Sequence, residues 1–248
     1  MRNILGRFDD TGGKYEPSVR EHPVLGRLDY THLPLDLVRR VCPEDFDKIR
    51  RYHAFALVRD PQTRFVSALS QRFKMYNSRE LAQLDRSEVN RLAREVVETL
   101  RREPDATRRP EFVHFARQSD YIFLDGDQLV ETIQPTSKAG DMIQQISQLT
   151  GEELGDVGND NPTMVFRSGA FRRMALAGKW IGERTLGPET VRRGRKVARR
   201  AMMKPLLNSR DAYTLSDDVS DFVQDYYAQD LKLYEKVKKA CKTSQSKA

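Results

Sequence analysis

The chain has 248 residues, a formal net charge of +7 and a mean hydropathy of −0.68. Its length suits one large α/β domain with a sizeable core, and no apolar run approaches the roughly 20 residues that cross a bilayer. Two cysteines make neither a disulfide framework nor a metal site, and the first residues lack the apolar core of a signal peptide, so we expect a soluble protein in a reducing compartment, the cytoplasm.

The first part of the chain is mostly polar. Glycines and a proline within residues 1–31 indicate loops. Residues 32–41 predict a short amphipathic helix. Its expected buried side consists of Leu35, Val38 and Val41. Pro43 begins another short helix, which leads into the next element.

Residues 53–73 predict a strand, a tight turn and a helix. The apolar run 54–58 is typical of a strand buried on both faces, and Pro61 suits the first turn of the helix. Arg59 lies at the carboxyl end of the strand, where ligands bind in open α/β sheets, and its planar donors suit a phosphate. Ser67, two turns into the helix, can add a hydroxyl donor.

The phrase Arg59-Asp60-Pro61-x-x-Arg64-x-x-Ser67-Ala68 resembles the 3′-phosphate-binding segment of the sulfotransferases of the carbohydrate and membrane-associated kind. That family has a strand, Arg-(Asp/Glu/Asn)-Pro, a second Arg, and a Ser eight residues after the first Arg; all these positions match. The resemblance implies that Arg59 and Ser67 bind the 3′-phosphate of 3′-phosphoadenosine 5′-phosphosulfate (PAPS), supported by Arg64. The alternative is that Arg59 caps an ordinary strand and Ser67 is a surface residue.

The resemblance is incomplete near the N-terminus. Members of this family open with a strand and a Lys-containing, Ser/Thr-rich loop that holds the 5′-phosphosulfate. Only Thr11-Gly12-Gly13-Lys14 is loosely similar, no apolar strand precedes it, and a solvated turn is the favoured interpretation. We therefore expect that the sequence either begins downstream of the true start or lacks half of the cofactor site.

Two histidines are candidate catalytic residues. In several members of the family a His near the position of His32 takes the proton from the acceptor hydroxyl, a task that suits a pKa near neutrality. Residues 112–118 resemble the family's aromatic-rich phrase ending in Gln beside the active site, which makes His114 the second candidate. His114 and Gln118 would share a face if this segment is helical. For both histidines a structural role is the alternative.

Residues 74–110 predict a charged surface helix with Ser87 as its N-cap. Its apolar stripe consists of Val89, Leu92, Val96 and Leu100. In the family, this region varies and helps to select the acceptor. The runs 121–124 and 129–133 predict strands around a turn at Asp125-Gly126. A helix that ends at Gly151 follows, and this alternation of strand and helix favours a parallel sheet.

The last third contains a basic segment. Residues 167–204 carry twelve Lys and Arg and two acids, a net charge of +10. A helix rich in arginine is expected within it. Its cations either form a solvated face or bind an anionic surface. We expect this segment to make peripheral contact with a membrane, where lipid-linked acceptors would be found. Nucleic acid is disfavoured because no aromatic residues interleave the cations of 189–204.

Two further segments resemble the family. Asn161 and Thr163 loosely fit an Asn-x-Ser/Thr phrase that lies near the cofactor, although such loops are commonly plain turns. Residues 216–240 predict a closing helix, and the phrase Tyr227-Ala228-Gln229-Asp230 resembles the family's structural C-terminal signature. The tail 241–248 is polar.

Together these features predict a single α/β domain over residues 1–240, with a central parallel sheet flanked by helices and a basic helical insertion at 167–204. The resemblance implies that this domain has a P-loop-like sulfotransferase core. The resemblance implies sulfuryl transfer from PAPS to a hydroxyl or amine of a carbohydrate or lipid-linked acceptor. Two alternatives remain open: a non-catalytic relative that keeps the 3′-phosphate pocket, and a basic protein that binds membranes or nucleic acid.

Overall fold

The computed structural model describes residues 2–15, 18–76, 81, 84–155, 164–166, 203–205 and 214–245. The chain divides into two compact units, one made of Met1–Gly158 with Arg210–Ala248 and the other of Asn159–Ser209. The described part of the second unit is an antiparallel pair of strands, β7 (Met164–Phe166) and β8 (Met203–Pro205). Most of the basic segment and the Asn161 and Thr163 loop lie outside the described residues.

The first unit opens with a short helix, an antiparallel hairpin and two further helices. These elements are α1 (Arg2–Leu5), η1 (Gly6–Phe8), β1 (Val19–His22), β2 (Gly26–Asp29), α2 (Leu35–Val41) and α3 (Pro43–Arg51). The two helices expected in this region are confirmed. Leu37 is almost fully buried and packs with Leu28 and Leu33, whereas Val38 and Val41 are only half-buried.

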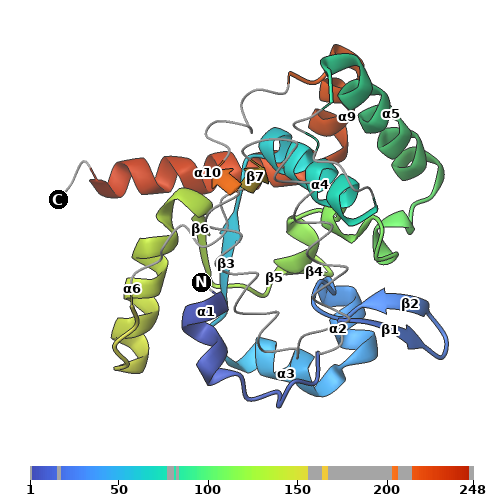
Figure 1. The fold of residues 1–248 in the computed structure, drawn as a ribbon. Helices are drawn as coiled ribbons and strands as arrows, with labels where there is room; N and C mark the ends of the chain where they lie inside the picture. Colours follow the sequence, from blue (N-terminus) through green and yellow to red (C-terminus); the bar gives the residue numbers. More distant parts are fainter. Residues whose placement is uncertain are drawn as a thin grey trace, which may run out of the picture. The chain divides into compact units, whose positions relative to one another are not determined.

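A parallel strand pair joins two distant parts of this unit. Strand β3 (Phe55–Val58) pairs in parallel with β6 (Thr132–Pro135), and α4 (Pro61–Tyr76) follows β3 after a two-residue turn. Figure 1 shows the two strands side by side. The structure is therefore mixed α/β with a small parallel sheet. Within β3 only Val58 is fully buried, while residues 55–57 are half-buried, because an apolar run does not by itself supply the layers that would cover it.

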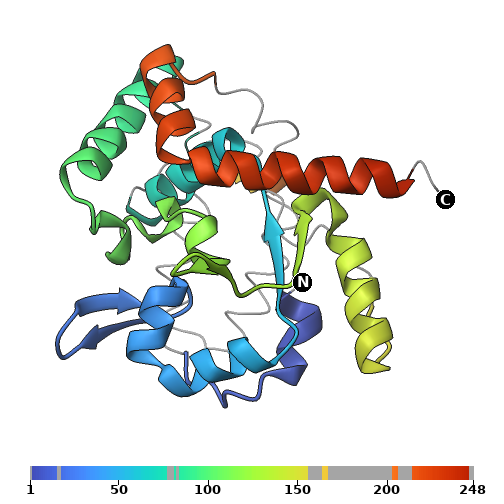
Figure 2. The ribbon, with the colours of Figure 1, turned by 180° about the vertical axis from the view of Figure 1, so that it is seen from behind.

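Two of the later helices pack against β6, and other helices pack on one another. The remaining elements are α5 (Arg86–Arg102), η3 (Ala106–Arg108), η4 (Val113–Phe115), η5 (Ser119–Tyr121), β4 (Phe123–Leu124), β5 (Asp127–Gln128), η6 (Thr136–Lys138), α6 (Ala139–Thr150), α9 (Asp217–Tyr226) and α10 (Ala228–Gln245). Helix α10 packs against β6, and α5 lies beside α9; both relationships are visible from the two sides in Figures 1 and 2.

Several expected boundaries shift. The strand predicted at 121–124 is shortened to β4, and the strand predicted at 129–133 is displaced to β6. The turn at Asp125-Gly126 is confirmed, since both residues have positive φ and connect β4 to β5. Gly151 ends α6 with φ 71°, a left-handed conformation that glycine adopts without a steric penalty.

The predicted cap of α5 was wrong. Asp85 is the N-cap: its side chain accepts the backbone N–H of Glu88, and the Glu88 side chain accepts the backbone N–H of Asp85. This reciprocal arrangement is a capping box. Ser87 lies inside the helix, where its hydroxyl donates to Asp85 at 2.8 Å.

The closing helix predicted over 216–240 is divided into α9 and α10 at Tyr227. The backbone of Tyr227 has φ −103° and ψ 25°, which departs from helical values. Its side chain is buried and its hydroxyl donates to the carbonyl of Phe115 at 2.7 Å. A tertiary contact therefore overrides a sequence pattern that is continuously helical.

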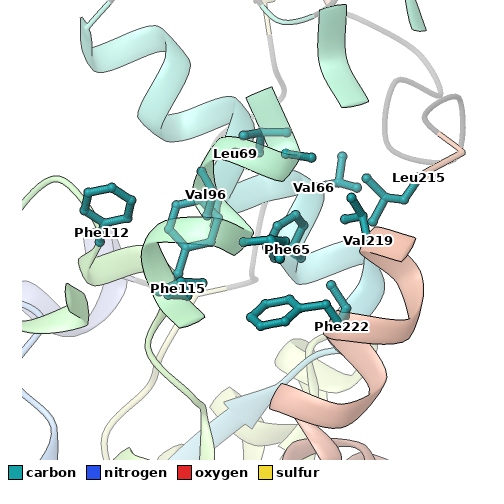
Figure 3. Packing of buried hydrophobic residues seen from close by; sticks show 14 of the residues in the cluster. Phe65, Val66, Leu69, Val96, Phe112, Phe115, Leu215, Val219 and Phe222 are labelled. Carbon is teal, nitrogen blue, oxygen red and sulfur yellow. The ribbon is translucent and has the colours of Figure 1, made fainter. Parts of the chain in front are cut away.

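Within the described part of the chain, the largest apolar core lies between α4, α5, η4 and α9. Phe65 and Phe115 are completely buried and meet with ring centroids 5.3 Å apart. Figure 3 shows Phe65 from α4 lying between Phe115 on one side and Val219 and Phe222 of α9 on the other. Burial of each large apolar side chain contributes roughly 1.5–3 kcal/mol, so this core fixes α4. Among the described residues, no helix is both long and apolar enough to traverse a bilayer.

Candidate functional site

The turn between β3 and α4 brings together the two residues that the sequence singled out for phosphate binding. Nη1 of Arg59 donates to Oγ of Ser67 at 3.0 Å. Because Ser67 accepts in this bond, its own hydroxyl proton can be donated to a third group. A guanidinium and a hydroxyl therefore converge at the carboxyl end of a parallel strand, as the sequence predicted.

The local sequence explains why α4 begins at this position. The side chain of Asp60 accepts the backbone N–H of Thr63 at 2.9 Å, and its carbonyl accepts the backbone N–H of Arg64 at 2.9 Å. Asp60 is thus the N-cap and Pro61 the first helical residue, two positions at which these residue types are favoured. The cap fixes the helix start directly after Arg59, so that Ser67 faces back toward the turn.

A buried glutamine holds the backbone of Arg59. Oε1 of Gln118 accepts the Arg59 backbone N–H at 2.8 Å, and Nε2 of Gln118 donates to the Arg59 carbonyl at 2.8 Å. Gln118 in turn donates its own backbone N–H to Asp230 at 2.7 Å. The sequence placed Gln118 beside the site, but it gave no sign of this reciprocal pairing.

The second part of the site is centred on His32. Its Nδ1 lies 2.9 Å from Oδ2 of Asp29, and the hydroxyl of Thr31 donates to Oδ1 of the same carboxylate at 2.7 Å. Burial acts to raise the pKa of Asp29, but the hydrogen bonds from His32 and Thr31 outweigh it and lower this pKa to about 2. An ionised carboxylate only accepts hydrogen bonds, so Nδ1 carries the proton and Nε2 is the basic nitrogen of neutral His32.

The two candidate histidines are in contact. The rings of His32 and His114 lie edge to face, with centroids 4.7 Å apart. Burial lowers the pKa of His114, repulsion from the protonated form of His32 and from Arg64 lowers it further, and Asp29 acts in the opposite direction. The hydroxyl of Tyr121 donates to the backbone carbonyl of His32 at 2.9 Å. His114 and Tyr121 therefore hold His32 against Asp29.

The condition under which His114 and Gln118 would share a helical face is not met. Residues 113–115 form one 3₁₀ turn that ends at Phe115, and the chain at Ala116 is no longer helical. As a result His114 contacts His32, while Gln118 contacts Arg59. The segment between them joins the two parts of the site.

Arg64, predicted to support the phosphate site, lies in the first turn of α4. Its positive charge lowers the pKa of His114 and opposes the rise that burial gives to the pKa of Tyr121. The described contacts therefore place its charge near the histidine part of the site.

Lys14 lies in a turn, as the sequence favoured. Gly12 and Gly13 have φ values of 60° and 79°, and the backbone N–H of Lys14 donates to the Thr11 carbonyl at 3.1 Å. The ammonium of Lys14 donates to Asp45 on α3 at 2.6 Å, an interaction that raises the pKa of Lys14. The described residues before this turn are the helical elements α1 and η1 rather than a strand.

Sequence reasoning missed Asp29, Tyr121 and the contact role of Asp230. Asp29 was detectable as an acidic residue three positions before His32, although that spacing alone is common. Tyr121 was assigned to a strand, and Asp230 was read only as part of a structural signature. Comparison of the chain with protein-family models, with curated proteins and with solved structures finds no match.

Proposed function

We propose that the chain is a sulfotransferase that transfers a sulfuryl group from PAPS to a hydroxyl or amine of a carbohydrate or lipid-linked acceptor. The observation that carries the proposal is the 3.0 Å hydrogen bond between Arg59 and Ser67 at the end of a parallel strand. These two residues hold the positions of the family's 3′-phosphate ligands in the resembling phrase. The mixed α/β fold is compatible with that family's P-loop-like nucleotide-binding core.

The donor groups fit a 3′-phosphate. The Arg59 guanidinium offers charge-assisted hydrogen bonds, and Ser67 adds a hydroxyl proton from the adjacent helix. When bound, PAPS supplies an activated sulfuryl group on a leaving group that departs as 3′,5′-adenosine bisphosphate. The task of Arg59 and Ser67 is to fix the nucleotide so that the reacting atoms are aligned, which is the main source of rate enhancement in transfers of this kind.

His32 is the residue best suited to accept the acceptor's proton. The hydrogen bond from Nδ1 to Asp29 fixes the tautomer and leaves Nε2 as the base. Asp29 also stabilises the positive charge that His32 gains on taking the proton. His114 contacts the His32 ring edge to face, and the positive charge of Arg64 acts on His114. In this proposal the charge of Arg64 would stabilise the negative charge that develops on the transferring group.

Calorimetry with 3′,5′-adenosine bisphosphate tests the nucleotide site directly. We expect the wild type to bind and Arg59→Ala to lose about 10-fold to 100-fold in affinity, since a hydrogen bond to a charged group contributes about 1.5–3 kcal/mol. Thr63→Ala is the matched control, because it lies on the same helix turn and its hydroxyl donates only to the Asp60 carbonyl. Equal binding by wild type and Arg59→Ala, or no binding by either, would remove the basis for the proposal.

One observation favours a second candidate, a non-catalytic relative that binds the nucleotide without turnover. Lys14, the lysine of the stretch that loosely resembles the 5′-phosphosulfate loop, is engaged by Asp45 in a turn. Nucleotide binding that depends on Arg59, without sulfuryl transfer from labelled PAPS to any glycan acceptor, would support this candidate. Transfer that is lost in His32→Gln would exclude it.

A further inference from the structure

We propose that Gln118 and Asp230 are positioning residues for the phosphate site, so that the junction between α9 and α10 sets the place of Arg59. This inference rests on the proposed function for its ligand, but the contacts that carry it lie within the chain. They form a continuous series of hydrogen bonds from the first turn of α10, through Gln118, to the backbone of Arg59 and on to Ser67.

The backbone of Arg59 needs such support because the strand ladder ends just before it. The last parallel pair joins Val58 to Pro135, and proline has no N–H to donate. Gln118 satisfies both the N–H and the carbonyl of Arg59, each at 2.8 Å. A two-point pairing fixes the orientation of the peptide groups, and with it the direction in which the Arg59 side chain leaves the backbone.

Asp230 fixes Gln118. It is only 1% exposed, and its two carboxylate oxygens accept the backbone N–H groups of Gln118 and Ser119 at 2.7 and 2.8 Å. Asp230 lies in the first turn of α10, where the helix dipole favours a negative charge. The carboxylate therefore ties the turn at 118–119 to the start of a long helix.

Two further contacts attach the same segment to the junction. The hydroxyl of Tyr227 donates to the Phe115 carbonyl at 2.7 Å, and Nε of Arg117 donates to the Tyr226 carbonyl at 2.9 Å. Residues 115–119 are thus held from one side by the α9–α10 junction. Because His114 precedes this segment, a displacement of the junction would move the Arg59 part and the histidine part of the site together.

The test compares three variants of the full chain. Asp230→Asn replaces one acceptor oxygen by an amide group that cannot accept, and Gln118→Met keeps the side-chain length but removes both bonds to Arg59. Asn90→Ala is the matched control, because Asn90 is also buried and accepts the backbone N–H of Ser216 at 2.7 Å, outside this series of contacts. The readouts are the dissociation constant for 3′,5′-adenosine bisphosphate, the hydrogen-exchange rate of the Arg59 amide, and the melting temperature.

We expect Asp230→Asn and Gln118→Met to weaken nucleotide binding by about tenfold or more, the change that corresponds to loss of one buried hydrogen bond, and to accelerate exchange of the Arg59 amide. Asn90→Ala should lower the melting temperature and leave the other two readouts unchanged. If Asp230→Asn does not fold, Gln118→Met decides the question with the same readouts.

The outcomes separate this inference from the proposed function. Wild-type affinity and wild-type Arg59 exchange in the folded variants would overturn the positioning role, even while loss of binding in Arg59→Ala upheld the nucleotide site. Accelerated Arg59 exchange in Asp230→Asn, in a protein whose wild type binds no nucleotide, would uphold the positioning of Arg59 and exclude the proposed ligand.

Discussion

His32 and His114 lie edge to face with their ring centroids 4.7 Å apart, although one follows a hairpin strand and the other sits in a 3₁₀ turn far along the chain. Nδ1 of His32 is hydrogen-bonded to Asp29. Burial and the positive charge of Arg64 lower the pKa of His114, so that the His114 ring stays neutral to a lower pH than usual. The two rings therefore differ in their contacts: Nδ1 of His32 is hydrogen-bonded to a carboxylate, and His114 packs against the His32 ring.

The lowered pKa of His114 predicts a pH dependence of stability. The unfolded chain binds a proton at this residue near its ordinary pKa of 6.5, whereas the native state does so only at lower pH. Between the two values the unfolded state holds more protons, so stability falls as the pH drops below 6.5. We expect the urea midpoint of the wild type to fall more across this range than that of His114→Gln. Equal falls in both proteins would contradict the assignment.

Substitution of Asp29 should affect proton transfer and leave nucleotide binding intact. Asp29→Asn removes the carboxylate that fixes the His32 tautomer, and His32→Gln removes the base itself. If the chain transfers sulfuryl groups, we expect His32→Gln to lower kcat by about 100-fold, within the range of general-base catalysis, and Asp29→Asn to lower it less. Calorimetry should give both variants the wild-type affinity for 3′,5′-adenosine bisphosphate. A loss of nucleotide affinity would argue that His32 serves the fold rather than the chemistry.

The α5 cap provides a direct comparison between the sequence prediction and the structure. Asp85→Ala should lower the free energy of unfolding by about 1 kcal/mol, the usual effect of removing an N-cap. Ser87→Ala should change it by less, because Ser87 donates only to the capping carboxylate. Chemical denaturation of the two variants measures the difference. A larger loss for Ser87→Ala would restore the N-cap that the sequence pattern suggested.

Truncation of the central ring of the core should be costly. Phe65 is completely buried on α4 against Phe115 and Phe222, so we expect Phe65→Ala to lower the free energy of unfolding by about 3–5 kcal/mol. Val24, which is 82% exposed at the tip of the β1–β2 hairpin, offers the control: Val24→Ala should stay within about 0.5 kcal/mol of the wild type. The measurement is denaturant unfolding, in which the dependence of the unfolding free energy on denaturant concentration should be the same for the wild type and both variants.

The charge of residues 167–204, a net +10 by sequence, predicts binding to anionic surfaces. We expect the protein to co-sediment with vesicles that contain an anionic lipid and to dissociate from them as the salt concentration is raised. It should not co-sediment with neutral vesicles. Replacement of Arg192, Arg193 and Arg195 by Gln should weaken the binding, while Arg59→Ala should not. Retention of the triple variant on the vesicles would assign the contact to another surface.

The sequence alone determined the segment around Arg59, because every signal in it is local. Pro61 follows an acidic N-cap, the apolar residues of α4 recur at helical spacing, and Ser67 lies two turns from the cap. These features fix backbone geometry within a few residues, and so the convergence of Arg59 and Ser67 could be predicted. The left-handed stop at Gly151 was predictable for the same reason.

Only the tertiary structure decided which distant groups meet at this segment. The pairing of Gln118 with Arg59, the two hydrogen bonds to Asp230 and the contact of His32 with His114 join residues far apart in the chain. Such contacts depend on how helices and strands pack. Packing between distant segments produces no local or periodic sequence pattern from which the contacting residues could be predicted. The break at Tyr227 has the same origin, since a single buried hydroxyl bonded to the Phe115 carbonyl redirects a sequence that reads as one continuous helix.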